Sequence, residues 1–221
     1  MHTYGFPAEL DSINNLCKQY NINLVEDAAE SLGSMYKDQH TGTVGKISAI
    51  SFNGNKIITT GGGGMLLTND KILAERAKHI TTTCKVKHKW IFEHDEVGYN
   101  YRLPNLNAAL GLAQIELLPK ILESKRMISE KYIDWGKKNG IEFIKDRKFT
   151  KANFWLNTAI TGSLSERDEM LEETNNNGVT TRPVWRPMHK LDIYQKFKKI
   201  DLANTEWLYD RRVNVPSSPI F

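Results

Sequence analysis

The sequence predicts an α/β fold followed by a smaller α+β domain. Two features predict the α/β part: a helix leads into a short apolar strand that ends in two acidic residues, and a second apolar strand ends in a polar loop. A change to short strands after Gly140 indicates the α+β part. The chain has 221 residues, of which 40% are hydrophobic, so it is long enough to bury a sizeable core.

The first helix and strand are predicted near the start of the chain. Residues 7–20 favour a helix, because their apolar side chains form one stripe and a proline opens the segment. Residues 22–25 form a short apolar strand that ends at Glu26 and Asp27. Ligands of α/β sheets bind beyond the carboxyl ends of the strands, so these two carboxylates are candidates for a site.

The following segment predicts three more strands. The first covers residues 47–52 and ends in the polar loop 53–56. Residues 57–60 and 65–68 are predicted as two strands, joined by a tight turn that four consecutive glycines form. A strand follows these glycines where a helix would be needed, so they are not a dinucleotide-binding motif.

A helix, a long loop and a strongly helical region complete the first part of the chain. Asn69 or Asp70 is expected to cap the short helix. Residues 81–102 are polar and aromatic without clear periodicity, which predicts a long loop of functional importance. Residues 105–138 have apolar side chains at helical spacing, and we expect Pro119 to break or kink the helix.

The last third of the chain predicts a small α+β domain. Its expected elements are strands at 141–144 and 154–160, a helix at 165–176, a strand at 179–184 and two helical stretches after Leu191. We therefore place a first domain at residues 1–120 and a second at residues 121–221.

Composition and charge exclude several classes of protein. The net charge of +4 comes from short, scattered basic clusters, so a nucleic-acid binder is not favoured, whereas attraction of an anionic small molecule such as a nucleotide diphosphate stays open. Cys17 and Cys84 give neither a disulfide framework nor the ligand spacing of zinc motifs, and no metal site is predicted. No apolar run of membrane-spanning length and no leader peptide are recognised, so a cytoplasmic protein is expected.

Several motifs occur in one order along almost the whole chain. They are Glu26-Asp-Ala-Ala-Glu-Ser-Leu-Gly33, Ser51-Phe-Asn-Gly-Asn-Lys56, Gly61-Gly-Gly-Gly64, Gly98-Tyr-Asn-Tyr-Arg-Leu-Pro104, Asn105-Leu-Asn-Ala-Ala-Leu-Gly111 and Thr181-Arg-Pro-Val-Trp-Arg-Pro-Met-His189. In order and spacing they resemble the DegT/DnrJ/EryC1/StrS sugar aminotransferases. The resemblance implies a pyridoxal-phosphate (PLP) enzyme of fold type I, the aspartate-aminotransferase-like fold. The chain would then hold part of the large PLP-binding domain and the small C-terminal domain.

The resemblance implies roles for two catalytic residues, which also bind the cofactor. Lys56 matches the lysine that holds PLP covalently and carries a proton during transamination. Asp27 matches the carboxylate that keeps the pyridine nitrogen protonated. Taken alone, Lys56 could be an exposed lysine and Asp27 could cap a turn.

The resemblance also implies further binding residues. Ser51 matches the phosphate-binding serine, and Asn100 matches an asparagine that the family lends to the phosphate of the neighbouring subunit in a homodimer. Glu30 matches a position that flanks the cofactor. His189 lies in a segment similar to the substrate side of the family's site. Ser51, Asn100 and His189 also have a purely structural interpretation, as a strand-end serine, a turn asparagine and a structural histidine.

The implied reaction passes an amino group, from glutamate, to a keto group of a nucleotide-linked sugar in surface polysaccharide synthesis. Lys56 favours aminotransfer, since relatives that carry histidine at this position are dehydratases. Residues 85–98 and 213–218 look most like the LegC-type branch, which aminates 4-keto sugars.

The chain departs from the family at its start, because residues 2–11 resemble the middle of the large domain. The family places upstream of this point a helix N-terminus that holds the phosphate, an aromatic ring that stacks on the cofactor, and several strands. We therefore expect an inactive fragment, or one half of a split enzyme that acts with a separate N-terminal chain, as alternatives to an active enzyme. A non-catalytic interaction module is the rival from another class, and it predicts no cofactor binding.

Overall fold

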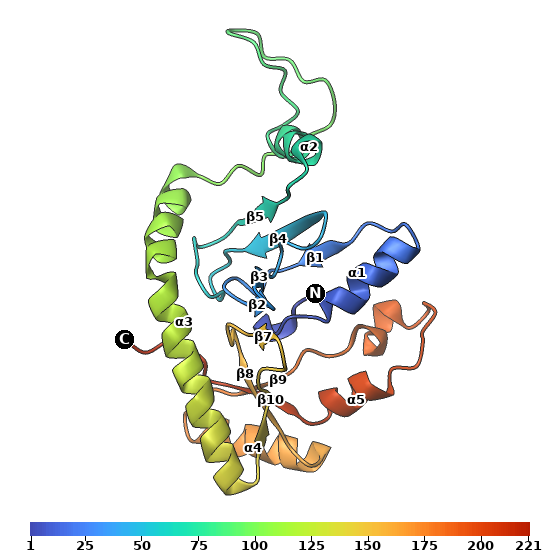
Figure 1. The fold of residues 1–221 in the computed structure, drawn as a ribbon. Coiled ribbons are helices and arrows are strands. Elements are labelled where there is room, and N and C mark those ends of the chain that lie inside the picture. Colours follow the sequence, from blue (N-terminus) through green and yellow to red (C-terminus); the bar gives the residue numbers. More distant parts are fainter. The chain divides into compact units, whose positions relative to one another are not determined.

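The computed structural model describes residues 1–221 (Figure 1), which form two compact units. The first unit comprises Met1–Glu123 and Asp146–Trp155, and the second comprises Ser124–Lys145 and Leu156–Phe221. The units are groups of residues in mutual contact and are not a test of domain boundaries. The domains at residues 1–120 and 121–221 therefore stay a prediction. The two units are described separately.

A three-stranded sheet forms the centre of the first unit, in the order β1–β4–β5. Strand β1 (Val25–Asp27) runs parallel to β4 (Ile47–Ser51), and β5 (Gly64–Leu67) is antiparallel to β4. Asp27 pairs with Ala49 in the register of β1 and β4. The parallel pairing brings the carboxyl ends of β1 and β4 to one edge of the sheet, as the α/β prediction requires.

The predicted strand at residues 57–60 is wrong. These residues are irregular because their backbone turns back on the end of β4: the Thr60 amide donates to the Phe52 carbonyl at 3.0 Å. Ile57 and Ile58 are buried all the same, so an apolar run that looked like a strand is a buried turn. The glycines then lead directly into β5, where Gly64 lies so close to Ile50 that a Cβ would come within 2.4 Å of its carbonyl oxygen.

Two helices of the first unit confirm the sequence patterns. Helix α1 (Leu10–Gln19) lies within the predicted 7–20 segment and follows a short 3₁₀ turn, η1 (Thr3–Gly5). Helix α2 (Lys71–Thr81) begins at Asp70, whose carboxylate accepts hydrogen bonds from the amides of Ile72 and Leu73. Asp70 is therefore the capping residue of the two candidates.

A second small sheet joins residues 146–155, which are distant in the sequence, to the first unit. Strand β2 (Met35–Tyr36) pairs with β3 (Gln39–His40) on one side and with β7 (Thr150–Lys151) on the other. Residues 152–155 follow β7 and are buried in this unit. The strand predicted at 154–160 is therefore only partly right, since β8 (Asn157–Ile160) begins after Trp155.

The predicted long loop follows α2 and extends away from the sheet of its own unit (Figure 1), and its functional importance stays a prediction. Two backbone bridges, Thr82 with Asn100 and Lys85 with His94, hold the base of the loop together. Helix α3 (Asn105–Asn139) follows and includes Pro119. A break at Pro119 is therefore wrong, and the alternative of a kink stays a prediction. A proline removes one hydrogen bond from the helical ladder, and the helix-favouring residues on both sides maintain the helix.

The second unit is built on an antiparallel sheet in the order β6–β8–β10–β9, which agrees with the α+β prediction. The sheet consists of β6 (Glu142–Phe143), β8, β9 (Arg182–Pro183) and β10 (Arg212–Val215). The helices are α4 (Leu164–Asn176) and α5 (Ala203–Tyr209), with the 3₁₀ turns η2 (Met188–Lys190) and η3 (Asp192–Tyr194). Phe143, Ala159 and Val215 form its buried core. No helix of either unit combines the length and the apolar character that a bilayer-spanning segment needs.

Candidate functional site

Two predicted site residues lie at the same edge of the central sheet. Asp27 ends β1, and its carboxylate is exposed and accepts a hydrogen bond of 3.1 Å from the Ala29 amide. Ser51 ends the neighbouring parallel strand β4, and its hydroxyl accepts a weak bond of 3.3 Å from the Asn53 amide. Both side chains thus keep hydrogen-bonding capacity for a ligand beyond the strand ends.

Lys56 lies in the loop that follows β4. Its Nζ is 3.8 Å from a carboxylate oxygen of Glu30 and 4.0 Å above the centre of the Trp155 ring, and only 13% of its side chain is exposed. The Trp155 indole N–H donates to the Asn55 carbonyl at 2.6 Å. The same tryptophan therefore fixes the loop and receives the ammonium group on its face.

The carboxylate of Glu30 interacts electrostatically with both Lys56 and Asp27. Its buried carboxylate accepts a hydrogen bond of 2.7 Å from the Tyr4 amide. Burial raises the pKa of Glu30, the Tyr4 N–H and the Lys56 ammonium oppose this change, and the charge of Asp27 adds to it. Glu30 thus interacts electrostatically with both predicted catalytic residues, and the three form one charged cluster.

The residues that support this cluster were not predicted from the sequence. Trp155 lies 100 residues beyond the loop that it fixes, and it packs against Tyr4 with 6.1 Å between ring centres. Asn153 is fully buried, and its side-chain amide donates to the carbonyls of Glu30 and Leu32. No spacing rule links these positions, because the pairing of β2 with β7 brings them together.

Asn100 and His189 are not part of this cluster. Asn100 is exposed in the long loop, where its backbone pairs with Thr82, and it forms no hydrogen bond with Asp27, Ser51 or Lys56. His189 belongs to the second unit, where its Nε2 is 2.8 Å from a carboxylate oxygen of Glu206. The roles of both residues stay predictions.

A large cavity lies on another part of the first unit. It measures about 1270 Å³ and is lined by β4, β5, α2 and residues 101–107. Its lining is mainly glycine and aliphatic side chains, including those of Met65, Leu66 and Leu103, and it contains none of the predicted site residues. The cavity has the character of an apolar packing surface, whereas the charged cluster has the groups for chemistry.

The charged cluster fits PLP by the chemistry of its donors. The cofactor carries a pyridine nitrogen, a phosphate and an aldehyde. The edge of the β1–β4 pair offers a carboxylate at Asp27 and a hydroxyl at Ser51, and the loop beyond it offers the amine of Lys56. Each group of the cofactor thus has a chemically suitable partner in one region of the chain.

Comparison with known proteins identifies the family. The model of the DegT/DnrJ/EryC1/StrS aminotransferase family matches residues 1–221. The chain belongs to this family. The resemblance predicted from the motifs is thereby confirmed, and members of the family are PLP-dependent sugar aminotransferases.

Individual members of the DegT/DnrJ/EryC1/StrS family agree with this assignment. The chain is 40% identical to GDP-perosamine synthase of Escherichia coli O157:H7 over 99% of its own length and 59% of the relative's. It is 31% identical to UDP-4-amino-4,6-dideoxy-N-acetyl-beta-L-altrosamine transaminase of Campylobacter jejuni, with 96% and 58% covered. The chain therefore spans about three-fifths of the length of these family members.

Solved structures of the family confirm the predicted fold. The aminotransferase TlmJ from Streptoalloteichus hindustanus superposes with a TM-score of 0.92 at 27% identity, covering 98% of this chain and 59% of TlmJ. PseC from Helicobacter pylori, an aminotransferase of pseudoaminic acid biosynthesis, gives 0.90 at 25% identity, with 98% and 60% covered. The fold is therefore that of the PLP-dependent aminotransferases, as predicted.

Proposed function

We propose that this chain is the lysine-bearing part of a PLP-dependent aminotransferase that acts on a keto group of a nucleotide-linked sugar in surface polysaccharide synthesis. The observation that carries the proposal is the charged cluster of Asp27, Glu30 and Lys56 beside Ser51. The names of its relatives, which include GDP-perosamine synthase and a UDP-linked amino-sugar transaminase, support the nucleotide-sugar substrate.

Each residue of the cluster has a proposed task. Asp27 would hold the pyridine nitrogen and keep it protonated, and Ser51 would hold the phosphate. The Lys56 amine would hold the cofactor and would carry a proton to and from the substrate carbon. When bound, PLP supplies an electron sink and a carrier for the amino group. Glu30 flanks the cofactor and balances the charge of Lys56.

Other details of the reaction remain proposals from the family resemblance. We propose glutamate as the amino donor, a 4-keto sugar as the acceptor, and membership in the LegC-type branch. A homodimer would let Asn100 reach the phosphate of the neighbouring subunit, which suits its exposed position in a long loop. His189 would contact the substrate, and the expected compartment is the cytoplasm.

A second proposal concerns what the site needs in order to work. The chain spans 59% of the length of GDP-perosamine synthase, and the cavity beside β4 and β5 exposes Met65 and Leu66, each 49% accessible. Exposed apolar surface next to a sheet is typical of a face that another segment covers. We therefore propose that catalysis requires a further polypeptide segment over this face, in the same chain or in a separate one.

The visible absorption spectrum of the purified chain mixed with PLP tests the first proposal. We expect a yellow band of lysine-bound cofactor that is absent in Lys56→Ala and is bleached by glutamate. Lys46→Ala is the matched control, because Lys46 is an exposed lysine at the other end of β4. An equal band in all three proteins would contradict the assignment of Lys56. A Lys56-dependent band that glutamate leaves unchanged would support the second proposal.

A further inference from the structure

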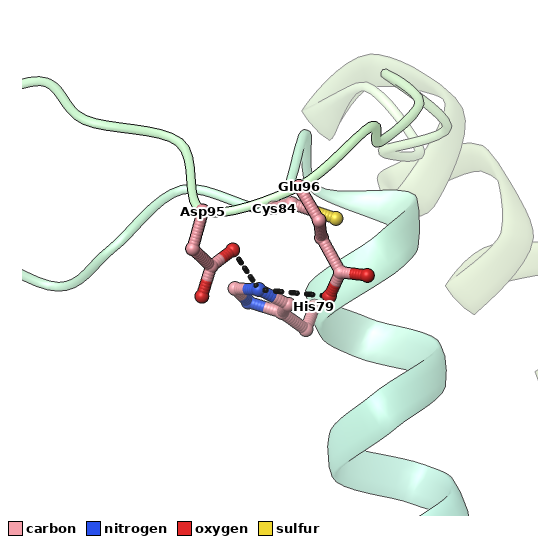
Figure 2. Close-up of side chains that lie close together, drawn as sticks. All are labelled: His79, Cys84, Asp95 and Glu96. Carbon is pink, nitrogen blue, oxygen red and sulfur yellow. Dashed lines mark hydrogen bonds and ion pairs between the residues drawn. The ribbon is translucent and has the colours of Figure 1, made fainter.

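Four side chains with metal-binding atoms meet at the base of the long loop. They are His79, Cys84, Asp95 and Glu96, and their ligand atoms all lie within 4.8 Å of one another (Figure 2). His79 comes from the last turn of α2, Cys84 from the outgoing side of the loop and the two acidic residues from its returning side. None of them belongs to the charged cluster at Lys56.

The side-chain geometry already brings the donors together. The Nε2 of His79 is 2.7 Å from a carboxylate oxygen of Asp95 and 3.6 Å from one of Glu96. The Cys84 side chain is fully buried, with its sulfur 3.5 Å from the Val97 carbonyl oxygen. Figure 2 shows this sulfur beside the Glu96 side chain.

The backbone holds the four residues in place independently of their side chains. The Cys84 amide donates to the His79 carbonyl at 2.9 Å, and the Asp95 amide donates to the Cys84 carbonyl at 3.2 Å. Gly98 closes the loop over Cys84, and a Cβ at this glycine would lie 2.7 Å from the sulfur. The two sides of the loop are therefore locked in a register that keeps the thiol facing the cluster.

We propose that His79, Cys84, Asp95 and Glu96 bind one zinc ion, which fastens the base of the long loop to α2. One sulfur, one imidazole nitrogen and two carboxylate oxygens form a donor set that zinc accepts in four-coordinate sites. Donors about 2.0–2.3 Å from zinc lie about 3.3–3.8 Å apart in a tetrahedron. Ligand atoms as far apart as 4.8 Å must therefore approach by about 1 Å, whereas the His79 nitrogen and the Asp95 oxygen, now 2.7 Å apart, must separate by about 0.6 Å. The exposed carboxylate of Asp95, with 54% of its side chain accessible, can make most of this movement.

The charges at the cluster favour a dication. Asp95 and Glu96 are two negative groups, and the guanidinium of Arg76, which binds both oxygens of Glu96, balances only one of them. On binding, zinc displaces the proton of the Cys84 thiol to water and bonds to the resulting thiolate. The complete site, with three anionic ligands, Arg76 and the dication, is then neutral. Arg76 keeps its bonds to Glu96 and orients that ligand, since each carboxylate oxygen has a second lone pair.

The ligand spacing along the chain explains why the sequence predicted no metal site. Zinc motifs that can be recognised in a sequence have pairs of cysteine or histidine residues a few positions apart. Here the ligands come from two sides of a loop and from the helix before it, so only the fold brings them together. The proposal does not depend on the proposed aminotransferase function.

Calorimetric titration of the reduced, chelator-treated chain with zinc sulfate tests the site. We expect one zinc per chain in the wild type and in Cys17→Ala, the control for the other cysteine of the sequence. Cys84→Ala and His79→Gln should lower the affinity by at least about 100-fold, with unchanged circular dichroism. Should either variant fail to fold, Asp95→Asn replaces it, and a loss of at least about tenfold is expected. No zinc binding in the wild type, or wild-type affinity in the folded ligand variants, would overturn the proposal.

Trypsin provides a second measurement, because the loop carries Lys85, Lys87 and Lys89 beyond the proposed site. Zinc should slow cleavage after these lysines in the wild type and in Cys17→Ala, and it should not do so in Cys84→Ala. Equal protection of Cys84→Ala would show that zinc acts elsewhere and would contradict a site at the base of the loop.

Discussion

At the scale of single residues, the adjacent Glu26 and Asp27 of β1 have different roles: Glu26 stabilises the fold, and Asp27 is a candidate site residue. Successive side chains of a strand point to opposite faces, and here Glu26 is buried while Asp27 is exposed. The two oxygens of Glu26 accept hydrogen bonds from His2 and from the backbone amides of Gly42, Val44 and Gly45. Glu26 thus organises the loop before β4, and Asp27 is left available for the cofactor.

The carboxylate of Glu26 makes the stability of the first unit depend on pH. Burial alone would raise the pKa of Glu26, but the bonds from His2 and from the amides of Gly45, Gly42 and Val44 lower it from 4.5 to about 2. Because the folded-state pKa lies below the unfolded value, the stabilisation is complete above about pH 5 and is lost as the pH falls from 4.5 towards 2. Its size is about 2–3 kcal/mol.

Urea unfolding of Glu26→Gln at two pH values measures this effect. We expect the variant to be about 2–3 kcal/mol less stable than the wild type at pH 7, and the difference to shrink at pH 3. Glu116→Gln is the control, since Glu116 is an exposed glutamate of the same unit. A difference between Glu26→Gln and the wild type that is equal at both pH values would contradict this account.

At the scale of elements, α2 depends on its cap more than on its packing. None of its residues is buried, so little apolar burial holds the helix in place. The Asp70 carboxylate satisfies two amides of the first turn, and Lys78 and His79 lie at the carboxyl end, where the helix dipole favours positive charge. The stability of α2 therefore rests on its cap and on the ion pairs of Arg76 and His79 with the long loop, rather than on apolar packing.

Hydrogen exchange in the peptide that covers α2 tests the role of the cap. Asp70→Ala should weaken the helix by about 1 kcal/mol, which raises the exchange rate of its amides about fivefold. Asp70→Asn should exchange at nearly the wild-type rate, because the asparagine oxygen also caps helices well. Wild-type exchange in Asp70→Ala would show that contacts outside the cap hold α2.

At the scale of the whole molecule, much of the architecture follows from sequence patterns. Short apolar segments predicted β4 and β5, and the ordered motifs led to the family. The buried turn at Ile57 and Ile58 was mistaken for a strand, because burial produces the same apolar run in both conformations. Apolar patterns could not predict the contact of Trp155 with Lys56 either, since this contact depends on pairing between distant strands. Local rules predicted elements well and long-range contacts poorly.

Chemical trapping of the cofactor tests whether Lys56 is the residue that attaches PLP. The chain is mixed with PLP and reduced with borohydride, and its peptides are mapped by mass spectrometry. We expect the pyridoxyl group to be concentrated on the peptide that contains Lys56, and Asp27→Asn to lower this labelling. Labelling spread over the exposed lysines, with no excess at Lys56 and no effect of Asp27→Asn, would contradict this role of Lys56.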